Sequence, residues 1–448
     1  MTQFEALGLS PNLLKSIHSL GFEKPTPIQS EAIPHVLRGR DLMGLAQTGT
    51  GKTAAFGLPL VQHLLADKAK AAPKSVRALI LAPTRELVNQ IASHLRAFAW
   101  RQPLHIALVV GGTSINAQIK TLARGTDILV ATPGRLIDLI ARRAVFLDKA
   151  KFLVLDEADQ MLDLGFIHAL RRIAKLVGTP RQTLLFSATM PKLIEELSRA
   201  YLNDPVRIEV SPPGRAVDKV RQSVHFTGSR NKVDLLKECL GERRDDLSLV
   251  FARTKHGAEK LMKSLVQSGF AAGSIHGNKS QGQRERAIKA FRDGEIRVLV
   301  ATDVAARGID IPGVSHVYNF DLPEVPENYV HRIGRTARAG AAGEAVAFCG
   351  PADTRLLRDI EKLMGMRVHV ASGEPAEAGR GKPVPGKALP SSAKKRNRGN
   401  QQRGARIDDT AASPSIARWR QKPSRQQRSG MGGTQHRPAK MLATERRV

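Results

Sequence analysis

The sequence contains little cysteine and no long apolar run. Its two cysteines, Cys239 and Cys349, stand far apart, and neither has a second cysteine at the short spacing of zinc ligands. The sequence therefore predicts neither a disulfide framework nor a zinc site. No segment approaches the roughly 18 apolar residues that a membrane span needs, and the first ten residues lack the basic and apolar regions of a signal peptide. We expect a soluble protein of the reducing cytoplasm.

Acidic and aromatic residues are also scarce. Asp and Glu number 41 against 70 Lys and Arg, which gives a formal net charge of +29. This excess favours a polyanionic partner such as nucleic acid. Aromatic residues make up only 4% of the chain, so we do not expect extended base-stacking platforms to dominate recognition.

Short apolar runs separated by helical stretches occur in two series, a pattern typical of buried strands in mostly parallel α/β sheets. The runs are 78–82, 107–112, 127–132, 152–156 and 183–189 in the first series, and 248–252, 273–277, 297–302, 316–320 and 344–349 in the second. We therefore predict two α/β domains, at 1–208 and 219–366. Two prolines and a glycine interrupt regular structure between them, which predicts a flexible linker at 209–218.

Apolar periodicity ends near residue 367, and the segment 367–448 is predicted to be a disordered basic tail. From residue 371 onward it has 18 Lys and Arg against five Asp and Glu, a net charge of +13. Its Gly, Pro, Ser, Gln and Arg cannot bury enough apolar area to offset chain entropy. The basic run 394–398 favours an electrostatic RNA tether. A solubilising extension without a specific target is the alternative.

A phosphate-binding loop follows an early apolar stretch and opens a helix. The match to the P-loop pattern is nearly complete, with Ala46 in place of the first glycine. Glycines let backbone N–H groups surround phosphate oxygens, Lys52 can reach the β and γ phosphates, and the Thr53 hydroxyl can ligate Mg²⁺. A glycine-rich turn without a ligand is the alternative for an isolated match. The predicted nucleotide-binding residues are Ala46, Gln47, Thr48, Gly49, Thr50, Gly51, Lys52 and Thr53.

The apolar run 152–155 leads directly into the sequence Asp-Glu-Ala-Asp at 156–159. At this place Asp156 can hold Mg²⁺, and Glu157 can orient and deprotonate an attacking water. A solvated helix start capped by Asp156 is the alternative. Because the phosphate loop precedes this segment in the same predicted domain, the two motifs together favour ATP hydrolysis.

These motifs resemble those of the DEAD-box ATP-dependent RNA helicases, over residues 4 to 365. The resemblance implies two tandem RecA-like domains and RNA-stimulated ATP hydrolysis, coupled to local, non-processive unwinding or remodelling of RNA duplexes and ribonucleoprotein. The segment 21–29 looks like the adenine-reading Q motif, with Phe4 as its upstream aromatic. Gln29 then hydrogen bonds to adenine and Phe22 stacks on it. A core position for Phe22 is the alternative.

Three further segments resemble family motifs. Ser187 and Thr189 belong to a motif that couples hydrolysis to strand separation, and we expect their hydroxyls to bond to the carboxylates at 156–159. A capped strand end is the alternative. The segment 301–310 resembles a motif in which Gly308 and Asp310 meet the nucleotide and Thr302 meets RNA.

The segment 329–338 resembles the family's arginine-finger motif. Arg335 and Arg338 would stabilise charge on the transferring phosphoryl group. A basic helix face is the alternative. Ala337 stands where glycine is usual, and because a helix tolerates alanine well we expect the finger geometry to be kept.

The candidate RNA contacts are small, hydroxyl and arginine side chains at strand ends, which suit a sugar-phosphate backbone and predict largely sequence-independent binding. The segment 275–281 and the basic tail look most like the bacterial RhlE-type subgroup. The candidate residues are Pro83, Thr84, Arg85, Gly111, Gly112, Thr132, Arg135, Arg253, Gln281, Arg284 and Thr302.

The motifs are divided between the two domains, so we expect hydrolysis to require domain closure, with ATP and RNA binding positively coupled. Two rival functions remain at this stage. One is an ATP-gated RNA clamp that separates no strands, and the other is an RNA-binding adaptor in which the nucleotide only stabilises the fold. Ribosomal or degradative ribonucleoprotein is a candidate partner.

Overall fold

The computed structural model describes residues 3–47, 49–210, 220–228, 231–306, 311, 313–337 and 342–375. The chain divides into two compact units, 1–382 and 383–448, and every described residue belongs to the first. Most of the predicted linker and tail lies outside the described residues. Among those described, no helix is both long and apolar enough to cross a membrane.

The first domain is built on a seven-stranded sheet in which every pairing is parallel, with the order β3-β4-β2-β5-β6-β1-β7. The strands are β1 (Leu42–Leu45), β2 (Val76–Leu81), β3 (Ile106–Val109), β4 (Thr126–Ala131), β5 (Phe152–Leu155), β6 (Gln182–Ser187) and β7 (Val206–Glu209).

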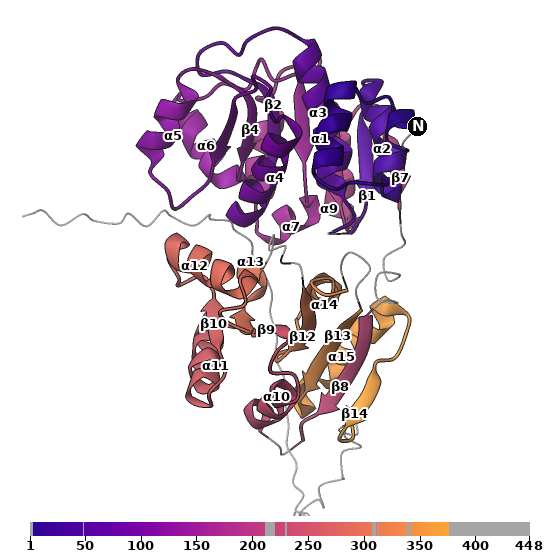
Figure 1. Ribbon diagram of the computed structural model, residues 1–448, viewed down its shortest axis with the longest axis vertical. Coiled ribbons are helices and arrows are strands. Elements are labelled where there is room, and N and C mark those ends of the chain that lie inside the picture. The colour runs from indigo at the N-terminus through magenta and orange to yellow at the C-terminus, as the bar shows by residue number, and fades with distance from the viewer. Residues whose placement is uncertain are drawn as a thin grey trace, which may run out of the picture. The chain divides into compact units, whose positions relative to one another are not determined.

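Helices cover both faces of this sheet (Figure 1). They are α1 (Pro11–Ser19), α2 (Pro27–Leu37), α3 (Lys52–Ala66), α4 (Arg85–Phe98), α5 (Ile115–Leu122), α6 (Pro133–Ala141), α7 (Ala158–Asp163), α8 (Ile167–Ala174) and α9 (Lys192–Tyr201), preceded by a short 3₁₀ turn, η1 (Glu5–Leu7).

Alternate residues of each strand pack into two separate apolar cores. In β2, Ile80 lies in the core formed with α1–α4, whereas Leu79 and Leu81 lie in the core formed with α6–α9. Because both faces are covered, these strands contain continuous apolar runs, which explains why the sequence pattern revealed them. Strand β1 is the early apolar stretch that precedes the phosphate loop, whereas β7, and β8 (Val220–Phe226) and β14 (His369–Ser372) of the second domain, did not appear as apolar runs. Strands β7 and β8 have charged or polar residues at alternate positions.

The second domain repeats this architecture with a seven-stranded parallel sheet of order β10-β11-β9-β12-β13-β8-β14. The strands are β8 (Val220–Phe226), β9 (Leu247–Phe251), β10 (Ala272–Ile275), β11 (Val298–Ala301), β12 (Val314–Asn319), β13 (Gly343–Cys349) and β14 (His369–Ser372).

Helices α10 and α11 contribute to the core on one face of this sheet, and α12–α15 contribute to those on the other. These elements are α10 (Lys232–Gly241), α11 (Lys255–Gln267), α12 (Gln281–Arg292), α13 (Asp303–Ala306), α14 (Pro326–Ile333), η3 (Pro351–Asp353) and α15 (Thr354–Met364).

The second domain extends beyond its predicted end at residue 366. Strand β14 pairs in parallel with β8, with His369 opposite Ser223. The boundary at 366/367 is therefore several residues too early. Exposed side chains along β14 gave it no apolar pattern in the sequence.

Candidate active site

The phosphate loop joins the carboxyl end of β1 to the N-terminus of α3. Gly49 and Gly51 have φ angles of 84° and 94°, a left-handed conformation that glycine adopts without strain. A Cβ atom on Gly51 would also collide with the side-chain amide of Gln29. Thr50 Oγ1 donates a hydrogen bond to the Gln47 carbonyl at 2.7 Å. The loop therefore has the local geometry that anion binding at a helix N-terminus requires.

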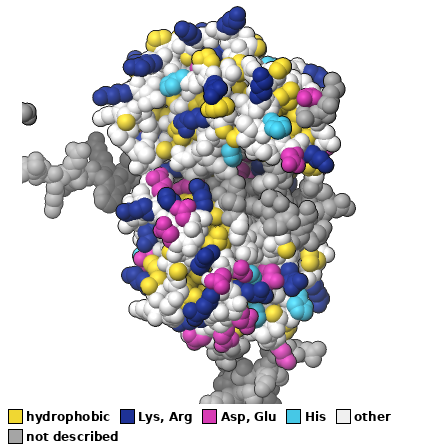
Figure 2. Space-filling view, viewed as in Figure 1, with side chains coloured by type: hydrophobic (Ala, Val, Ile, Leu, Met, Phe, Trp, Pro, Cys, Tyr) yellow, Lys and Arg dark blue, Asp and Glu magenta, His cyan; other side chains and the backbone are white. Residues whose placement is uncertain are grey.

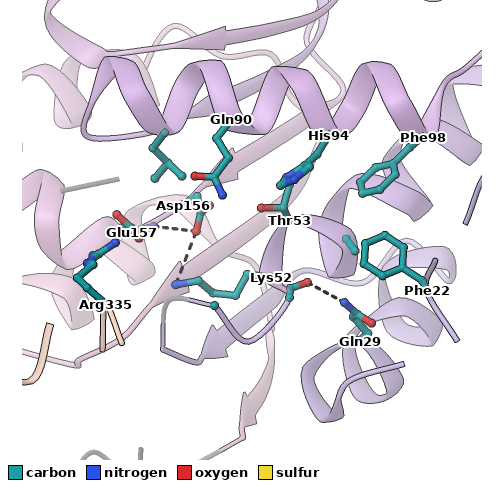
Figure 3. Close-up of a pocket in the computed structure, with 14 residues that line it drawn as sticks. Phe22, Gln29, Lys52, Thr53, Gln90, His94, Phe98, Asp156, Glu157 and Arg335 are labelled. Atoms are coloured by element: carbon teal, nitrogen blue, oxygen red, sulfur yellow. Dashed lines mark hydrogen bonds and ion pairs between the residues drawn. The ribbon is translucent and has the colours of Figure 1, made fainter. Parts of the chain in front are cut away.

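A cavity of about 270 Å³ lies beside this loop and is lined from both domains. Figure 3 shows Lys52, Asp156, Glu157 and Arg335 toward one end, and Phe22 and Gln29 toward the other. The lining residues are Phe22, Gln29, Gly49, Gly51, Lys52, Thr53, Ala54, Leu87, Gln90, His94, Phe98, Asp156, Glu157 and Arg335.

Lys52 and Asp156 face each other in the buried part of the cavity. Lys52 Nζ lies 3.9 Å from Asp156 Oδ1 and donates a hydrogen bond to the Ala46 carbonyl at 3.0 Å. Strand β6 lies between β1 and β5, so the two residues reach one site from strands that are not neighbours. Burial raises the pKa of the Asp156 carboxyl, and the Lys52 ammonium opposes that shift.

Glu157 is held in a strained backbone conformation at the end of β5. Its φ and ψ are 53° and 52°, a left-handed conformation that costs a residue with a Cβ about 1–2 kcal/mol. Burial raises the pKa of its carboxyl to about 7, although Lys52 and Arg335 act in the opposite direction. Glu157 Oε2 has no hydrogen-bond partner among the described residues. A buried carboxylate with this pKa suits a general base near neutral pH.

Arg335, from the segment after α14, lines the same cavity and is 6% exposed. The predicted residues Arg338, Gly308, Asp310 and Thr48 lie outside the described residues.

Ala337 does not lie in a helix, so the reason given for accepting alanine at this position was wrong. Helix α14 ends at Ile333, and Ala337 has a φ of 54°. In this left-handed conformation alanine is strained and glycine is not.

Gln29 is tied to the phosphate loop. Its Nε2 donates to the Gly51 carbonyl at 3.2 Å, and its Oε1 accepts from Thr26 N at 3.0 Å. One amide hydrogen and one oxygen lone pair remain for a ligand. Phe22 is 37% exposed at the cavity wall, so the alternative of a core position does not hold. Phe4 is itself a core residue, 2% exposed.

The coupling motif contacts the acidic segment through Asp159, a residue that the sequence did not single out. Asp159 Oδ2 accepts from Thr189 Oγ1 at 3.0 Å, Thr189 N at 2.9 Å and Ala188 N at 3.1 Å. The expected contact is thus present for Thr189. It is not present for Ser187, whose hydroxyl donates to the Thr189 carbonyl at 2.7 Å.

The first-domain candidates for RNA contact lie at one edge of the sheet. Thr84, Gly111 and Thr132 follow β2, β3 and β4, which are neighbours in the sheet. Arg85 packs against Gly112 so closely that a Cβ atom there would collide with its guanidinium. The other candidates are Pro83, which is buried, and Arg135, which donates to the Thr113 carbonyl at 3.1 Å.

In the second domain, two candidates bridge to the first. Arg85 Nη1 donates to Gln281 Oε1 at 3.2 Å, and Arg284 Nη2 lies 2.9 Å from Glu86 Oε1. Glu86 was not among the sequence candidates.

The two remaining second-domain candidates are not part of this bridge. Thr302 is buried after β11. Arg253 is held by Asp353 at 3.2 Å.

Surface charge differs between the domains on the face that Figure 2 shows. Lys and Arg side chains predominate there over the first domain, whereas the second domain mixes acidic and basic side chains. The visible surface of the second domain therefore offers no uniformly basic face.

Helix α4 supplies a cavity wall that the sequence analysis missed. Leu87, Gln90, His94 and Phe98 recur every three or four residues on one helical face, and all four line the cavity. His94 stacks on Phe98 with ring centroids 6.2 Å apart. The sequence feature that could have revealed this wall is the placement of a polar Gln and His within the apolar stripe of an amphipathic helix.

The residues expected to hold Mg²⁺ fit a cation. Asp156 and Glu157 are both buried, only one lysine lies within ion-pair distance of Asp156, and Glu157 Oε2 lacks a hydrogen-bond partner in the described part of the chain. Thr53 lines the same cavity. Hard oxygen donors of this kind suit Mg²⁺ together with nucleotide phosphates.

Comparison with known families gives two matches. The model of the DEAD/DEAH box helicases matches residues 26–197, and the model of the helicase conserved C-terminal domain matches residues 231–340. The first span contains the phosphate loop and the acidic segment, and the second contains the bridging residues of α12.

Individual relatives resemble most of the chain. The DEAD-box ATP-dependent RNA helicases CshA of Bacillus cereus and Bacillus anthracis are each 45% identical over 362 residues, which cover 81% of this chain and 68% of each relative. The solved structure of S. cerevisiae Dbp5 bound to RNA and ADP BeF3 has a TM-score of 0.74 at 33% identity, and the match covers 83% of this chain and 96% of that one.

Proposed function

The chain belongs to the DEAD-box family of ATP-dependent RNA helicases, with two tandem RecA-like domains, and we propose that these domains close on ATP and RNA to complete one active site. The protein is an RNA-stimulated ATPase. One observation gives the strongest support for closure: Arg335 of the second domain lines the same cavity as Lys52 and Glu157 of the first. Neither domain alone holds all three.

In the proposed hydrolysis step, Lys52 binds the β and γ phosphates and Glu157 accepts a proton from the attacking water. The water oxygen bonds to the γ phosphorus as the bond to the β–γ bridging oxygen breaks, and ADP leaves with the electron pair. Arg335 and Arg338 stabilise the negative charge that develops. Phe22 and Gln29 hold the adenine.

Mg²⁺ bound by Thr53 and Asp156 would neutralise phosphate charge. Lys52 donates a hydrogen bond to the Ala46 carbonyl and lies 3.9 Å from Asp156. This contact keeps the ammonium inside the cavity, where it can transfer to phosphate oxygens at little entropic cost.

RNA is proposed to bind along the carboxyl edge of the first sheet and the start of α12. Hydroxyl, glycine and arginine groups at these strand ends reach a sugar-phosphate backbone and no base edge, which supports sequence-independent binding. The bond between Thr189 and Asp159 connects the acidic segment to the end of β6, and supports a role in coupling hydrolysis to strand separation.

Finer assignments are also proposals. The segment 275–281 and the basic tail support the RhlE-type subgroup, whereas the curated relatives described above carry the name CshA. We propose a cytoplasmic protein that acts on ribosomal or degradative ribonucleoprotein, with its tail as an RNA tether. The net charge of +13 from residue 371 onward supports the tether.

The decisive experiment measures steady-state ATP hydrolysis with and without single-stranded RNA, in the native chain and in Glu157→Gln. We expect strong stimulation by RNA that disappears in the variant. Absence of stimulation in the native chain would contradict the proposal. A duplex-release assay then separates a helicase from an ATP-gated clamp, because only the helicase frees a short strand.

A further inference from the structure

Glu259 lies in the second turn of α11, and its carboxylate joins three side chains. Oε2 accepts hydrogen bonds from Ser274 Oγ at 2.7 Å and His276 Nε2 at 3.0 Å, and it pairs with Lys279 Nζ at 2.9 Å. These contacts, that of His276 first, lower the pKa of the Glu259 carboxyl to about 2. The carboxylate is therefore ionised throughout the physiological range.

The three partners of Glu259 follow the path of the chain from β10 to α12. Ser274 lies in β10, His276 follows the strand, and Lys279 lies two residues before α12 begins. His276 Nδ1 accepts from Asn278 N at 3.3 Å, which leaves the ring proton on Nε2 for the bond to Glu259. Ser274 and His276 are 4% and 3% exposed, so water cannot easily replace the carboxylate.

The start of α12 needs such support because it has little apolar anchoring. Among the residues of α12 only Phe291, near the other end, is buried. The N-terminal part carries Gln281 and Arg284, which reach Arg85 and Glu86 of the first domain. Polar contacts therefore hold the end of α12 that meets the first domain.

We propose that Glu259 is a positioning residue for the RNA-dependent step. Its carboxylate fixes the loop 276–280 and so sets Gln281 and Arg284 against the RNA backbone. This inference rests on the proposed function. A displacement of about 1 Å at the start of α12 is enough to break hydrogen bonds of the lengths seen there. Glu259 does not line the nucleotide cavity, so ATP binding is expected to be independent of it.

The test compares the full chain with Glu259→Gln, and uses Glu242→Gln, at an exposed site after α10, as the matched control. Glutamine keeps the size of the side chain but loses the charge that pairs with Lys279. ATP hydrolysis is measured against the concentration of single-stranded RNA. We expect the half-maximal RNA concentration to rise about tenfold in Glu259→Gln alone, which corresponds to about 1.4 kcal/mol.

The KM for ATP and the kcat at saturating RNA should stay unchanged in Glu259→Gln, whereas the Tm falls, because the charge that pairs with Lys279 is lost. An unchanged half-maximal RNA concentration would overturn the inference. A loss of ATP affinity in parallel with the loss of RNA affinity would also overturn it, because that result assigns Glu259 to overall stability alone.

A double variant tests whether Glu259 acts through α12. If it does, Glu259→Gln adds little to the RNA defect of Arg284→Gln, whereas independent sites give additive free energies. Additivity would overturn the positioning role while leaving the proposed function intact. Loss of RNA stimulation in the native chain would overturn the proposed function, and this inference with it.

Discussion

Thr189 and Asp159 are joined twice, because both the hydroxyl and the backbone N–H of Thr189 donate to Asp159 Oδ2, at 3.0 and 2.9 Å. The contact links the end of β6 to the helix that follows the catalytic carboxylates. This double contact supports the coupling role proposed for Thr189.

Replacing Thr189 with valine removes the hydroxyl bond and preserves the shape. We expect Thr189→Val to keep its RNA-stimulated ATPase rate within about threefold of the native chain, because the backbone bonds remain. The rate of strand separation should fall by about tenfold, which is the effect expected from loss of one hydrogen bond to a charged group. Parallel ATPase and duplex-release assays measure both. Equal losses in the two assays would argue against a coupling role.

The pKa of Glu157 predicts the pH dependence of the reaction. Its pKa is raised to about 7, and only the deprotonated form is a base, so kcat/KM for ATP should rise with pH and level off above about 7. Glu157→Gln should lower the rate by about 100-fold or more and abolish this rise. Initial rates between pH 5.5 and 8.5 provide the measurement. A flat profile in the native chain would exclude Glu157 as the base.

The same shift has a consequence for stability. Because the native state binds the Glu157 proton more tightly than the unfolded chain does, its contribution is greatest below about pH 4.5 and is lost as pH rises through about 7. Glu157→Gln should therefore unfold at a higher temperature than the native chain at pH 8, and the difference should shrink toward pH 5. Thermal unfolding of both proteins at pH 5 and pH 8 measures this difference in Tm. Equal Tm values at pH 8 would contradict the prediction.

The ion pair between Glu86 and Arg284 predicts coupling between the domains. Its side chains are 10% and 15% exposed, so removing one charge leaves the other poorly solvated. ATP is expected to tighten RNA binding in the native chain by a certain factor. In Glu86→Gln we expect that factor to be about 5–30 times smaller. RNA affinity with and without a non-hydrolysable ATP analogue measures this factor. The exposed Glu31, changed to glutamine, serves as the control and should behave as the native chain.

Ala337 predicts a stabilising substitution. Its φ of 54° strains alanine, and glycine relieves that strain, although it also increases the entropy of the unfolded chain. We expect Ala337→Gly to stabilise the protein by about 0.5–1 kcal/mol. Denaturant unfolding at equilibrium tests this, and Ala287→Gly, in the interior of α12, should destabilise instead. A destabilised Ala337→Gly variant would show that the conformation carries no strain.

Deletion of residues 376–448 tests whether the tail tethers RNA. Removal of 376–448 leaves β14 paired with β8, whereas a cut at 371 would divide that strand. We expect weaker RNA binding at low salt and a shallower slope of log affinity against log salt, by about 0.7 for each lost phosphate contact to a single strand. Basal ATPase should be unchanged. The same slope in both proteins would contradict the tether.

The contacts made by distant residues required the structure. The sequence predicted that Thr189 bonds to a carboxylate at 156–159, and the structure identifies that carboxylate as Asp159. His94 seemed part of an amphipathic stripe until α4 brought it to the cavity. The left-handed conformation of Ala337 depends on where α14 ends, and the sequence around it predicted a helix.

The sequence by itself determined the two-domain α/β architecture and the phosphate loop, because apolar runs and glycine spacing act within a few residues of the chain. The family resemblance implied that Arg335 acts at the phosphates, and the tertiary structure decided that it enters the cavity with Glu157. The tertiary structure alone decided that Glu86 meets Arg284. These pairs lie far apart in sequence, and no local pattern records them. The order of strands in the two sheets and the meeting of the domains set which of their charges come into contact.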